Sequence, residues 1–293
     1  MSQDKGIKKT KTEQKLDFVK MHGCGNDYIY VDCLDAPIDN MEAIAIKLSD
    51  RHFSVGGDGV IFICPSEKCD ATMRMFNSDG SEGKMCGNGI RCVGKYLYDN
   101  GKTDKLDITV DTLSGVKRLK LFVRDCKVDS VKVDMGAVVL DPKQVPVNLD
   151  GDCVIDRPIR TPLGTYNITC TSMGNPHCTL FVDDVMNFDV AGVGAAIGHN
   201  TELFPEGVNV GFMQAVDRTH FKLRVFERGS GETMACGSGT CAAVVAAALN
   251  GKCDKDTDIS VRVLGGELII RYTDDAVYMT GEAREAFRGV VRL

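Results

Sequence analysis

Apolar and polar residues alternate in short runs through the first half of the sequence, which is the pattern of half-buried β-strands. Residues 16–32 read as two β segments separated by a break at residues 23–26, where glycine and asparagine favour a turn. An apolar helical spacing predicts a helix over residues 41–49, with Asn40 as its N-cap. A second helix is predicted over about 87–98. The other predicted elements are strands at residues 60–63, 71–76 and 106–110 and a hairpin at residues 116–135.

The second half of the sequence repeats this order of elements. A β segment covers residues 166–183 with a break at residues 173–177, and a helix is predicted over residues 237–249. Strands outnumber helices and most are joined by short turns, so the sheets should be largely antiparallel. Strands are also predicted at residues 208–213 and 221–226, followed by hairpin-like segments at residues 259–272 and 276–293.

One short pattern occurs twice. The string FNSDGSEGKMCGNG spans residues 76–89, and FERGSGETMACGSG spans residues 226–239. With a shift of 150 positions, the Phe, one Glu, the Cys and both following Gly coincide. Upstream, a Gly-Asn dipeptide ends 60 residues before the cysteine in the first copy and 61 residues before it in the second. The sequence therefore reads as two copies of one fold, each with a cysteine at the start of a helix.

Cys86 and Cys236 each lie where a predicted strand ends and a predicted helix begins. The unpaired N–H groups and the positive dipole end of a helix favour a nearby thiolate and bind anions. These thiols, with an ordinary pKa of about 8.5, are therefore predicted to ionise near neutrality and to act as general bases. Two such thiols on opposite sides of one carbon can remove a proton from one face and return one to the other, which inverts the configuration.

A Cys-Gly-x-Gly segment also has other interpretations: a metal site, a phosphate loop or a buried structural cysteine. No Cys-x-x-Cys pair or histidine has the spacing of a zinc site. No Gly-Lys-Ser/Thr follows, as a P-loop would require. A single segment would more often be structural, but two segments in matched repeats favour a function.

Short polar side chains are predicted at the strand ends around these cysteines. Asn26, Asn175 and Asn209 each lie in or beside a turn, and an isolated asparagine there is most often a turn former. Glu227 and Arg228 end a strand nine residues before the second cysteine, and alone they would be a surface ion pair. Together these residues supply amides and a carboxylate for an ammonium group and a guanidinium for a carboxylate, as a zwitterionic amino acid requires.

Composition limits the compartment and the partners. The chain has 293 residues, is 43% hydrophobic and 26% charged, and carries a net charge of −6, which suits two domains and argues against a nucleic-acid partner. The most apolar run, residues 241–249, is too short to span a membrane. Thirteen cysteines without a cleavable signal segment indicate buried or reactive thiols rather than a secreted disulfide framework. We therefore expect a cytoplasmic protein.

The ends and the middle of the chain define the expected domains. Residues 1–15 hold five lysines and almost nothing apolar, so we expect a disordered N-terminal tail rather than a targeting or binding segment. A polar stretch with two prolines follows residue 134, where we place the boundary between lobes. The N-terminal lobe would comprise residues 16–133 with 282–293, and the C-terminal lobe residues 134–281.

Six motifs occur in order along the chain: KMHGCGND at 20–27, FNSDGSE at 76–82, CGNGIRC at 86–92, SMGNPH at 172–177, FPEGVN at 204–209 and ERGSGETMACGSG at 227–239. They resemble the motifs of the diaminopimelate epimerases, and the resemblance extends from about residue 16 to residue 293. It implies an α/β fold of the α+β type with two pseudo-symmetric lobes. Each lobe would be a curved, mostly antiparallel sheet or barrel around a central helix, with the active site in the cleft between the lobes. The resemblance also implies a homodimer that uses no metal, no pyridoxal phosphate and no other cofactor.

The same resemblance assigns roles to individual residues. Cys86 and Cys236 would be the catalytic pair. His177 and Glu227 would be activating groups, His177 near Cys86 and Glu227 near Cys236. The backbone amides at the start of the two helices would hold the α-carboxylate at the reacting carbon. The substrate-binding residues would be Asn26, Asn77, Gly87, Asn88, Asn175, Asn209, Glu227, Arg228, Gly237 and Ser238.

Two positions depart from the family's pattern. Gly59 stands where some members carry a glutamine, so we expect one polar contact to be missing. Cys24 stands where many members carry an aliphatic residue, and we interpret it as a packing residue.

The implied reaction is the interconversion of LL- and meso-diaminopimelate, a step of lysine and peptidoglycan-precursor synthesis. One cysteine as thiolate would take the α-proton while the other, as thiol, delivers a proton to the opposite face. One alternative is a cofactor-independent racemase or isomerase of the same fold that acts on another amino acid, such as proline, histidine or glutamate. Another is a non-catalytic or redox-sensing protein in which Cys86 and Cys236 form a disulfide. Glu227, Arg228 and the four asparagines favour a substrate with a second amino-acid head group, and so favour diaminopimelate.

Overall fold

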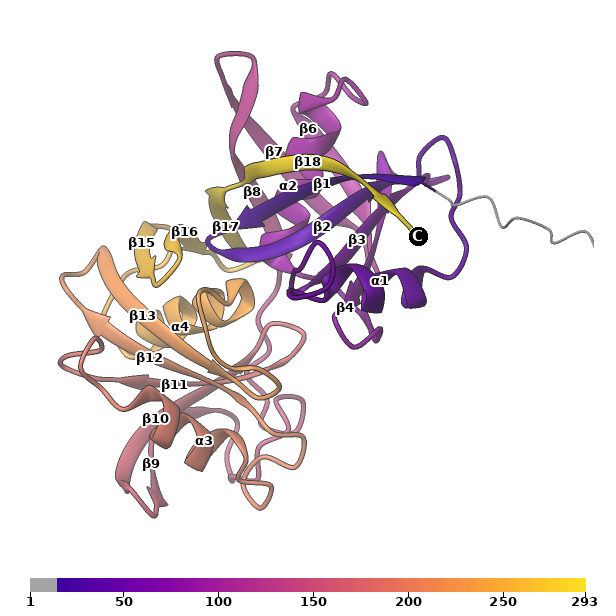
Figure 1. Ribbon diagram of the computed structural model, residues 1–293. Helices are drawn as coiled ribbons and strands as arrows, with labels where there is room; N and C mark the ends of the chain where they lie inside the picture. Colours follow the sequence, from indigo (N-terminus) through magenta and orange to yellow (C-terminus); the bar gives the residue numbers. More distant parts are fainter. Residues whose placement is uncertain (1–14) are drawn as a thin grey trace, which may run out of the picture.

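The computed structural model describes residues 15–293, and most of its elements form two matching series (Figure 1). Each series runs strand, strand, helix, three strands, helix, three strands. The first series comprises β1 (Lys15–Gly23), β2 (Asn26–Asp32), α1 (Met41–Ser49), β3 (Gly59–Cys64), β4 (Ala71–Asn77), β5 (Glu82–Gly83), α2 (Gly87–Asp99), β6 (Asp107–Asp111), β7 (Lys117–Arg124) and β8 (Lys127–Gly136). The second comprises β10 (Gly164–Ser172), β11 (Pro176–Phe181), α3 (Val190–Gly198), β12 (Asn209–Ala215), β13 (His220–Glu227), β14 (Gly231–Thr233), α4 (Gly237–Leu249), β15 (Asp258–Val263), β16 (Gly266–Tyr272) and β17 (Val277–Glu282). Strand β9 (Val154–Thr161) precedes the second series, and β18 (Arg284–Arg292) follows it.

Within residues 15–293 the strands pair into one continuous 18-stranded sheet. The pairs are parallel at β2–β3 and β4–β6 in the first series and at the equivalent β11–β12 and β13–β15 in the second, and antiparallel elsewhere. Strand β18 pairs with β1 in the same way as β9 pairs with β10. We call β1–β8 with β18 the first half and β9–β17 the second half. The antiparallel pair of β8 with β17 joins them.

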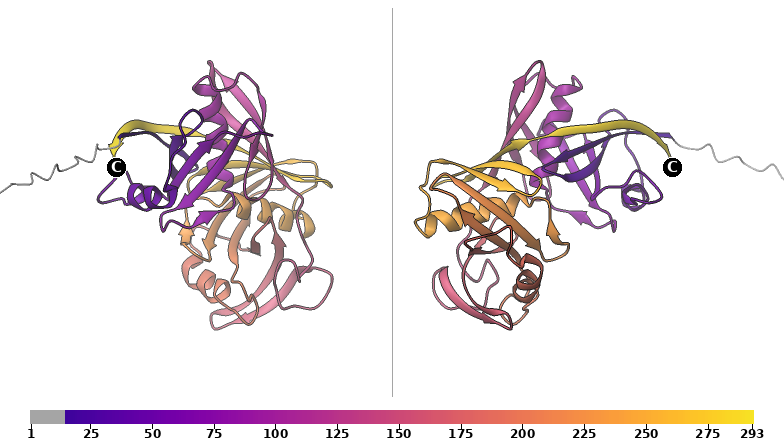
Figure 2. Two further views of the ribbon diagram at one scale, coloured as in Figure 1. Left: turned by 90° about the vertical axis from the view of Figure 1, so that its right-hand side faces the viewer. Right: turned by 60° about the vertical axis from the view of Figure 1, so that its left-hand side comes forward.

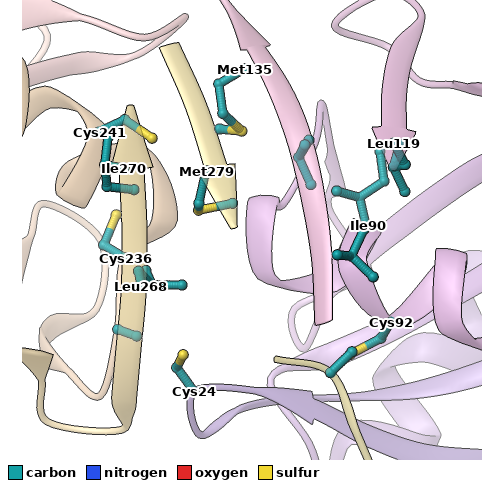
Figure 3. Packing of buried hydrophobic residues seen from close by; sticks show 14 of the residues in the cluster. Cys24, Ile90, Cys92, Leu119, Met135, Cys236, Cys241, Leu268, Ile270 and Met279 are labelled. Atoms are coloured by element: carbon teal, nitrogen blue, oxygen red, sulfur yellow. The ribbon is translucent and has the colours of Figure 1, made fainter. Parts of the chain in front are cut away.

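Helices α2 and α4 are the central helices of the two halves. The residues of helix α4 are small and mostly apolar on every side, so the helix is buried on every side. Helix α2 packs against β1, β2, β7 and β8, and α4 packs against β10, β11, β12, β16 and β17. One apolar cluster includes residues of both helices, and Figure 3 shows Met135 of β8 and Met279 of β17 between the side chains of α2 and those of α4. Helices α1 and α3 pack on smaller, separate clusters. This is the α+β arrangement that the sequence predicts.

Residues 276–293 do not form the hairpin that their pattern predicts. Strand β17 pairs with β16 on one side and with β8 on the other, so it has no free edge for β18. After the buried Ala283 the chain enters β18, which pairs with β1 of the first half, where Lys15 lies opposite Arg292 (Figures 1 and 2). The alternation of apolar and polar residues predicts that this segment is a strand. It does not show which other strand the segment pairs with.

Several local features also differ from the predictions. Asn40 occupies the N-cap position of α1 with a φ of 57°, but its side chain makes no capping hydrogen bond. Helix α3 and strand β9 are absent from the predicted elements. The sequence of α3, VAGVGAAIG, has no apolar period and contains three glycines, and β9 contains Pro158 and three charged residues. Residues 1–14 of the predicted tail lie outside the described residues, and Lys15 already belongs to β1.

The predicted lobe boundaries at 133/134 and 281/282 fall inside β8 and β17, the two strands that join the halves. The division of the chain into lobes stays a prediction. No helix within residues 15–293 has the length and apolar character needed to cross a membrane.

Candidate active site

Cys86 and Cys236 lie at the N-caps of α2 and α4, where the sequence places them. Both residues have extended backbone, and each sulfur accepts a hydrogen bond from the first turn of its own helix. The N–H of Gly89 lies 3.3 Å from the Sγ of Cys86, and the N–H of Gly239 lies 3.4 Å from the Sγ of Cys236. Each sulfur is therefore held in the positive field of a helix N-terminus, which favours the thiolate form.

The starts of the two helices lie against each other where the halves join. The Nδ2 of Asn88 donates a hydrogen bond to the carbonyl oxygen of Ala235 at 3.1 Å. Met279 lies beside both helix starts, because a Cβ at Gly87 would be 2.9 Å from its Cε and a Cβ at Gly237 would be 3.1 Å from its Sδ. Packing therefore favours glycine directly after both cysteines. The buried Oδ1 of Asn88 has no hydrogen-bond partner among the described residues.

Burial outweighs the helix dipole at both thiols. It raises the pKa of Cys86, although the backbone N–H groups of Gly89 and Asn88 act in the opposite direction. Burial also raises the pKa of Cys236, to well above its ordinary value, and the Glu227 carboxylate adds to that increase. The prediction that both thiols ionise near neutrality is therefore wrong for this structure, because a helix start supplies too little compensation for the loss of water.

Around Cys86, the first half places amide side chains at the ends of its strands. Asn26 begins β2, and its Oδ1 accepts a hydrogen bond from the Cys86 thiol at 3.2 Å. The Nδ2 of Asn26 donates to the Oδ2 of Asp58 at 2.7 Å, a residue that sequence reasoning did not single out. Asn77 ends β4, and its Nδ2 donates to Ser81 Oγ at 3.0 Å. Asn26 thus contacts the thiol, whereas Asn77 binds within its own turn.

The second half gathers its polar residues at the equivalent strand ends. Asn209 begins β12, lies opposite His177 of β11, and accepts a hydrogen bond from the backbone N–H of Arg228 at 3.0 Å. The Nε2 of His177 lies 3.0 Å from Asn175 Oδ1 and 3.1 Å from Ser238 Oγ. The structure therefore brings these residues together at the start of α4.

Glu227 and Arg228 differ in their contacts. Glu227 is half-buried and accepts a hydrogen bond from Thr233 Oγ1 at 2.6 Å, and its charge adds to the effect of burial in raising the pKa of Cys236. Burial raises the pKa of Glu227, which makes its carboxylate a stronger proton acceptor. Arg228 is exposed, and its Nη1 donates to the carbonyl oxygen of Glu206 at 2.6 Å. Glu227 therefore acts on the thiol directly, and Arg228 lies further out.

Comparison with known sequences decides the family. A profile described as Diaminopimelate epimerase matches residues 18–140 and 169–285. The diaminopimelate epimerase of Acetivibrio thermocellus is 49% identical over 280 residues, which cover 95% of this chain and 99% of the relative. That of Agathobacter rectalis is 47% identical over 285 residues, which cover 94% of this chain and 99% of the relative. The chain belongs to the diaminopimelate epimerase family. It is therefore an isomerase, as its motifs imply.

Solved structures with this fold are more distant in sequence. A hydroxyproline epimerase from Agrobacterium vitis matches with a TM-score of 0.74 at 14% identity, over 96% of this chain and 93% of the other. A phenazine biosynthesis protein of the PhzF family from Bacillus anthracis matches with a TM-score of 0.68 at 18% identity, over 96% and 100%. Identities this low show the fold alone. The predicted two-lobed fold class is confirmed.

In this member of the diaminopimelate epimerase family, His177 lies near the start of α4. Burial lowers the pKa of His177 to about 3, and the positive charge of Arg228 acts in the same direction, so the ring is neutral at physiological pH. Its neighbour Ser238 has its Oγ 3.6 Å from the Sγ of Cys236. Within residues 15–293, no hydrogen bond of His177 leads to Cys86. Its assignment to Cys86 stays a prediction.

Both departures from the family's pattern have a packing reason. A Cβ at Gly59 would lie 2.1 Å from the carbonyl oxygen of Phe76, so this register leaves no room for a side chain. Cys24 is fully buried at the β1–β2 turn with a φ of 53°, and its thiol lies 3.8 Å from the carbonyl oxygen of Glu267 in β16. Cys24 therefore packs at the junction of the two halves.

Sequence reasoning missed Arg91. This residue is fully buried in α2, and within residues 15–293 it forms no ion pair with a carboxylate. Its guanidinium donates to the carbonyl oxygens of Glu282 at 3.1 Å and Gly87 at 3.3 Å. Its positive charge acts to lower the pKa of Cys86 against the effect of burial. Arg91 lies within the CGNGIRC motif, but an arginine in a helix pattern is normally read as exposed.

Proposed function

We propose that this protein interconverts LL- and meso-2,6-diaminopimelate without a cofactor, using Cys86 and Cys236 for proton transfer. Membership of the diaminopimelate epimerase family supports the substrate. One observation carries the mechanism. Each cysteine caps a central helix, and the two helix starts are in contact through Asn88 and Ala235. Two thiols presented from two halves can serve opposite faces of one carbon.

The α-proton of an amino acid is very weakly acidic, so the site must stabilise the negative charge that develops when it leaves. Preorganised N–H donors aimed at that charge are the largest catalytic contribution of many enzymes. The α-carboxylate of the substrate would bind between the two helix starts. The donors would be the backbone N–H groups of Gly87, Asn88, Gly237 and Ser238.

Each thiol needs a proton acceptor, since burial raises the pKa of both. Glu227 acts electrostatically on Cys236 and has a raised pKa itself, so it is suited to accept the proton of that thiol. Closure of the halves around the substrate would bring the neutral His177 ring toward Cys86 and would exclude water. Because burial lowers the pKa of His177 to about 3, the ring would orient that thiol rather than take its proton. One thiolate then removes the α-proton while the opposite thiol donates its own, and the reverse reaction exchanges their roles.

The remote end of diaminopimelate is a second amino-acid group. We assign its carboxylate to Arg228, whose planar guanidinium can bind it with two parallel hydrogen bonds. Amide oxygens and the Glu227 carboxylate would receive the ammonium group. The amides proposed to contact the substrate are those of Asn26, Asn77, Asn175 and Asn209.

We further propose a cytoplasmic homodimer, with lobes of residues 16–133 plus 282–293 and of residues 134–281. Strand β18 pairs with β1 alone among the described strands and carries the exposed Phe287 and Val290. A hollow of about 750 Å³ lies beside it, lined by β1, β18 and residues 35–38. An edge strand with exposed apolar side chains is a surface suited to a second copy. Val290→Lys should shift the sedimentation coefficient to that of the monomer.

Turnover of LL-diaminopimelate, beside a panel of proline, histidine and glutamate, tests the substrate. Inversion of diaminopimelate alone is expected. If another amino acid of the panel is inverted and diaminopimelate is not, the proposed substrate is wrong but the proposed two-thiol chemistry still holds. No turnover by fully reduced protein, together with a Cys86–Cys236 disulfide in the isolated protein, would favour a redox role.

The source of the new hydrogen tests the two-thiol mechanism. A thiol carries one proton, so the base that accepts the substrate hydrogen has none of solvent origin to return. In D₂O, early product should carry deuterium at the inverted carbon while unreacted substrate keeps protium, as measured by mass spectrometry. Early product with mainly the original hydrogen would show a single shuttling base instead.

A further inference from the structure

Two pairs of neighbouring cysteines lie outside the set of proposed catalytic and substrate-binding residues. Cys33 follows β2, Cys64 ends β3, and these strands are parallel with Asp32 opposite Ile63. The N–H of Cys33 donates to the carbonyl oxygen of Ile63 at 2.8 Å, which continues the register and sets Cys33 beside Cys64. The two thiols are close enough that each shifts the pKa of the other. Both side chains belong to the apolar cluster beneath α1.

The second pair provides a comparison within the same chain. Cys170 of β10 and Cys178 of β11 lie directly opposite each other in an antiparallel pair. Both are almost completely buried, at 2% and 0% exposure. Neighbouring strands lie about 4.8 Å apart, which is within the range of Cα separations that disulfides span. The two pairs therefore differ in the relative direction of their strands and in access to solvent.

Only the first pair offers a thiol that a small molecule can reach. Cys33 is buried, but Cys64 is partly exposed at the end of its strand. The neighbouring Cys33 thiol and the charge of nearby Arg74 lower the pKa of Cys64. The thiolate is the form that attacks a disulfide, so Cys64 is the nucleophile of the pair and Cys33 is placed to resolve the mixed disulfide.

We propose that Cys33 and Cys64 form a reversible disulfide by exchange with a low-molecular-weight disulfide of the glutathione type. The Cys64 thiolate attacks one sulfur of the oxidant, breaks its S–S bond and releases one small thiol. The Cys33 thiol then loses its proton and attacks the Cys64 sulfur, which releases the second small thiol. Two electrons pass from the protein pair to the oxidant, and two equivalents of reduced thiol are formed.

The disulfide would act on stability rather than on catalysis. It would close a loop that contains α1 and joins β2 to β3. Asn26 begins β2 and Cys33 follows its end, so at about 3.3 Å per residue the pair lies roughly 20 Å from the Asn26 side of the site. A crosslink over a loop of this length is expected to raise the melting temperature by roughly 5–10 °C.

The test exposes the fully reduced protein to oxidised glutathione. Non-reducing peptide mass spectrometry and thermal unfolding are then measured before and after dithiothreitol. We expect a Cys33–Cys64 crosslink, no Cys170–Cys178 crosslink, and a rise in melting temperature that dithiothreitol reverses. A stable glutathione adduct on Cys64 without the crosslink, or equal crosslinking of both pairs, would overturn the proposal.

Variants separate this disulfide from oxidation at the catalytic thiols. Cys64→Ser should abolish the rise in melting temperature, and Cys170→Ser should keep it. The rise should also persist in Cys86→Ser, in which no Cys86–Cys236 disulfide can form. A full rise in Cys64→Ser, or its loss in Cys86→Ser, would show that another disulfide is responsible. If Cys64→Ser does not fold, the crosslinks found in the wild-type protein show which disulfide forms. None of these measurements depends on the identity of the substrate.

Discussion

Cys86 and Cys236 occupy equivalent places in the two halves, with the same capping hydrogen bond and a glycine at the first helical position. The residues around them differ in charge. Five residues after the cysteine, α2 carries Arg91 and α4 carries Cys241. Nine residues before it, the first half has an asparagine and the second half has Glu227. The cation of Arg91 therefore acts on the first thiol, and the Glu227 carboxylate is the largest cause after burial of the raised pKa at the second.

A nearby cation favours a thiolate and a nearby carboxylate disfavours it. In agreement, the pKa of Cys236 is raised well above its ordinary value, whereas that of Cys86 is raised less, with burial as the main cause at both. A duplicated backbone can thus present two chemically different thiols through a few changed side chains. We expect Cys86 to carry the thiolate more often than Cys236.

The largest effect should come from removing either thiol. Cys86→Ala and Cys236→Ala should each lower kcat by at least ~100-fold, because one base cannot serve both faces of the carbon. Cys92→Ala and Cys241→Ala are matched controls, since both cysteines lie inside the helices rather than at their starts. Steady-state epimerisation measures all four. Near-normal turnover in either of the first two variants would contradict the two-thiol mechanism.

A smaller effect is expected at Arg228, whose position in the first half is taken by Ser78. Arg228→Lys keeps the charge but loses the planar fork, so kcat/KM for diaminopimelate should fall at least ~10-fold, which corresponds to about 1.4 kcal/mol. Arg218→Lys, at an exposed arginine paired with Asp254, should leave kcat/KM unchanged. Equal kinetics of the Arg228 variant and wild type would remove the main support for binding of the remote carboxylate.

Removal of the positive charge of Arg91 should reduce the difference in pKa between Cys86 and Cys236. Both thiols have raised pKa values, so the thiolate fraction and kcat/KM should increase as the pH rises. Arg91→Gln should displace the pH profile of Cys86 alkylation to higher pH, whereas that of Cys236, whose pKa is raised by burial and Glu227, should stay in place. Arg91→Lys retains the charge and should shift the Cys86 profile less. A parallel shift of both profiles would indicate a structural role for Arg91.

The smallest expected effect is the difference between the alkylation rates of the two cysteines in the wild-type protein. Cys86 is partly exposed and Cys236 is 6% exposed, so iodoacetamide at neutral pH should alkylate Cys86 several-fold faster. Peptide mass spectrometry over a time course gives both rates, and bound substrate should slow both. Equal rates without substrate would mean that the charge difference does not distinguish the thiols.

The parts of this site that could be predicted from sequence are local. A strand that ends at a cysteine followed by Gly-x-Gly and a run of small apolar residues specifies a capped helix start, and both copies have this pattern. The other features of the site depend on tertiary packing. Burial of Cys86 and Cys236, the buried position of Arg91 and the contacts of His177 depend on residues far away in sequence, so no local pattern reveals them.

For the fold too, local patterns predict the elements but not the long-range contacts between them. The order of strands and central helices follows from apolar periodicity, and it was predicted for nearly every element of both series. The missed helix α3 has apolar residues without a period, so its sequence alone does not separate it from a buried loop. The partner of β18 depends on which strand edges are free after the sheet has formed.

The pairing of β18 with β1 has a consequence for the order of folding during synthesis. At roughly 5–20 residues per second, β18 emerges about 14–55 s after β1, and until then β1 lacks a partner on one edge. The cluster beneath α1 also lacks Val291 and Leu293 during that interval. The second half pairs its strands without β18, so a chain truncated after Ala283 should protect β9–β17 from a protease while β1 is cleaved. The half that is translated first is thus completed last.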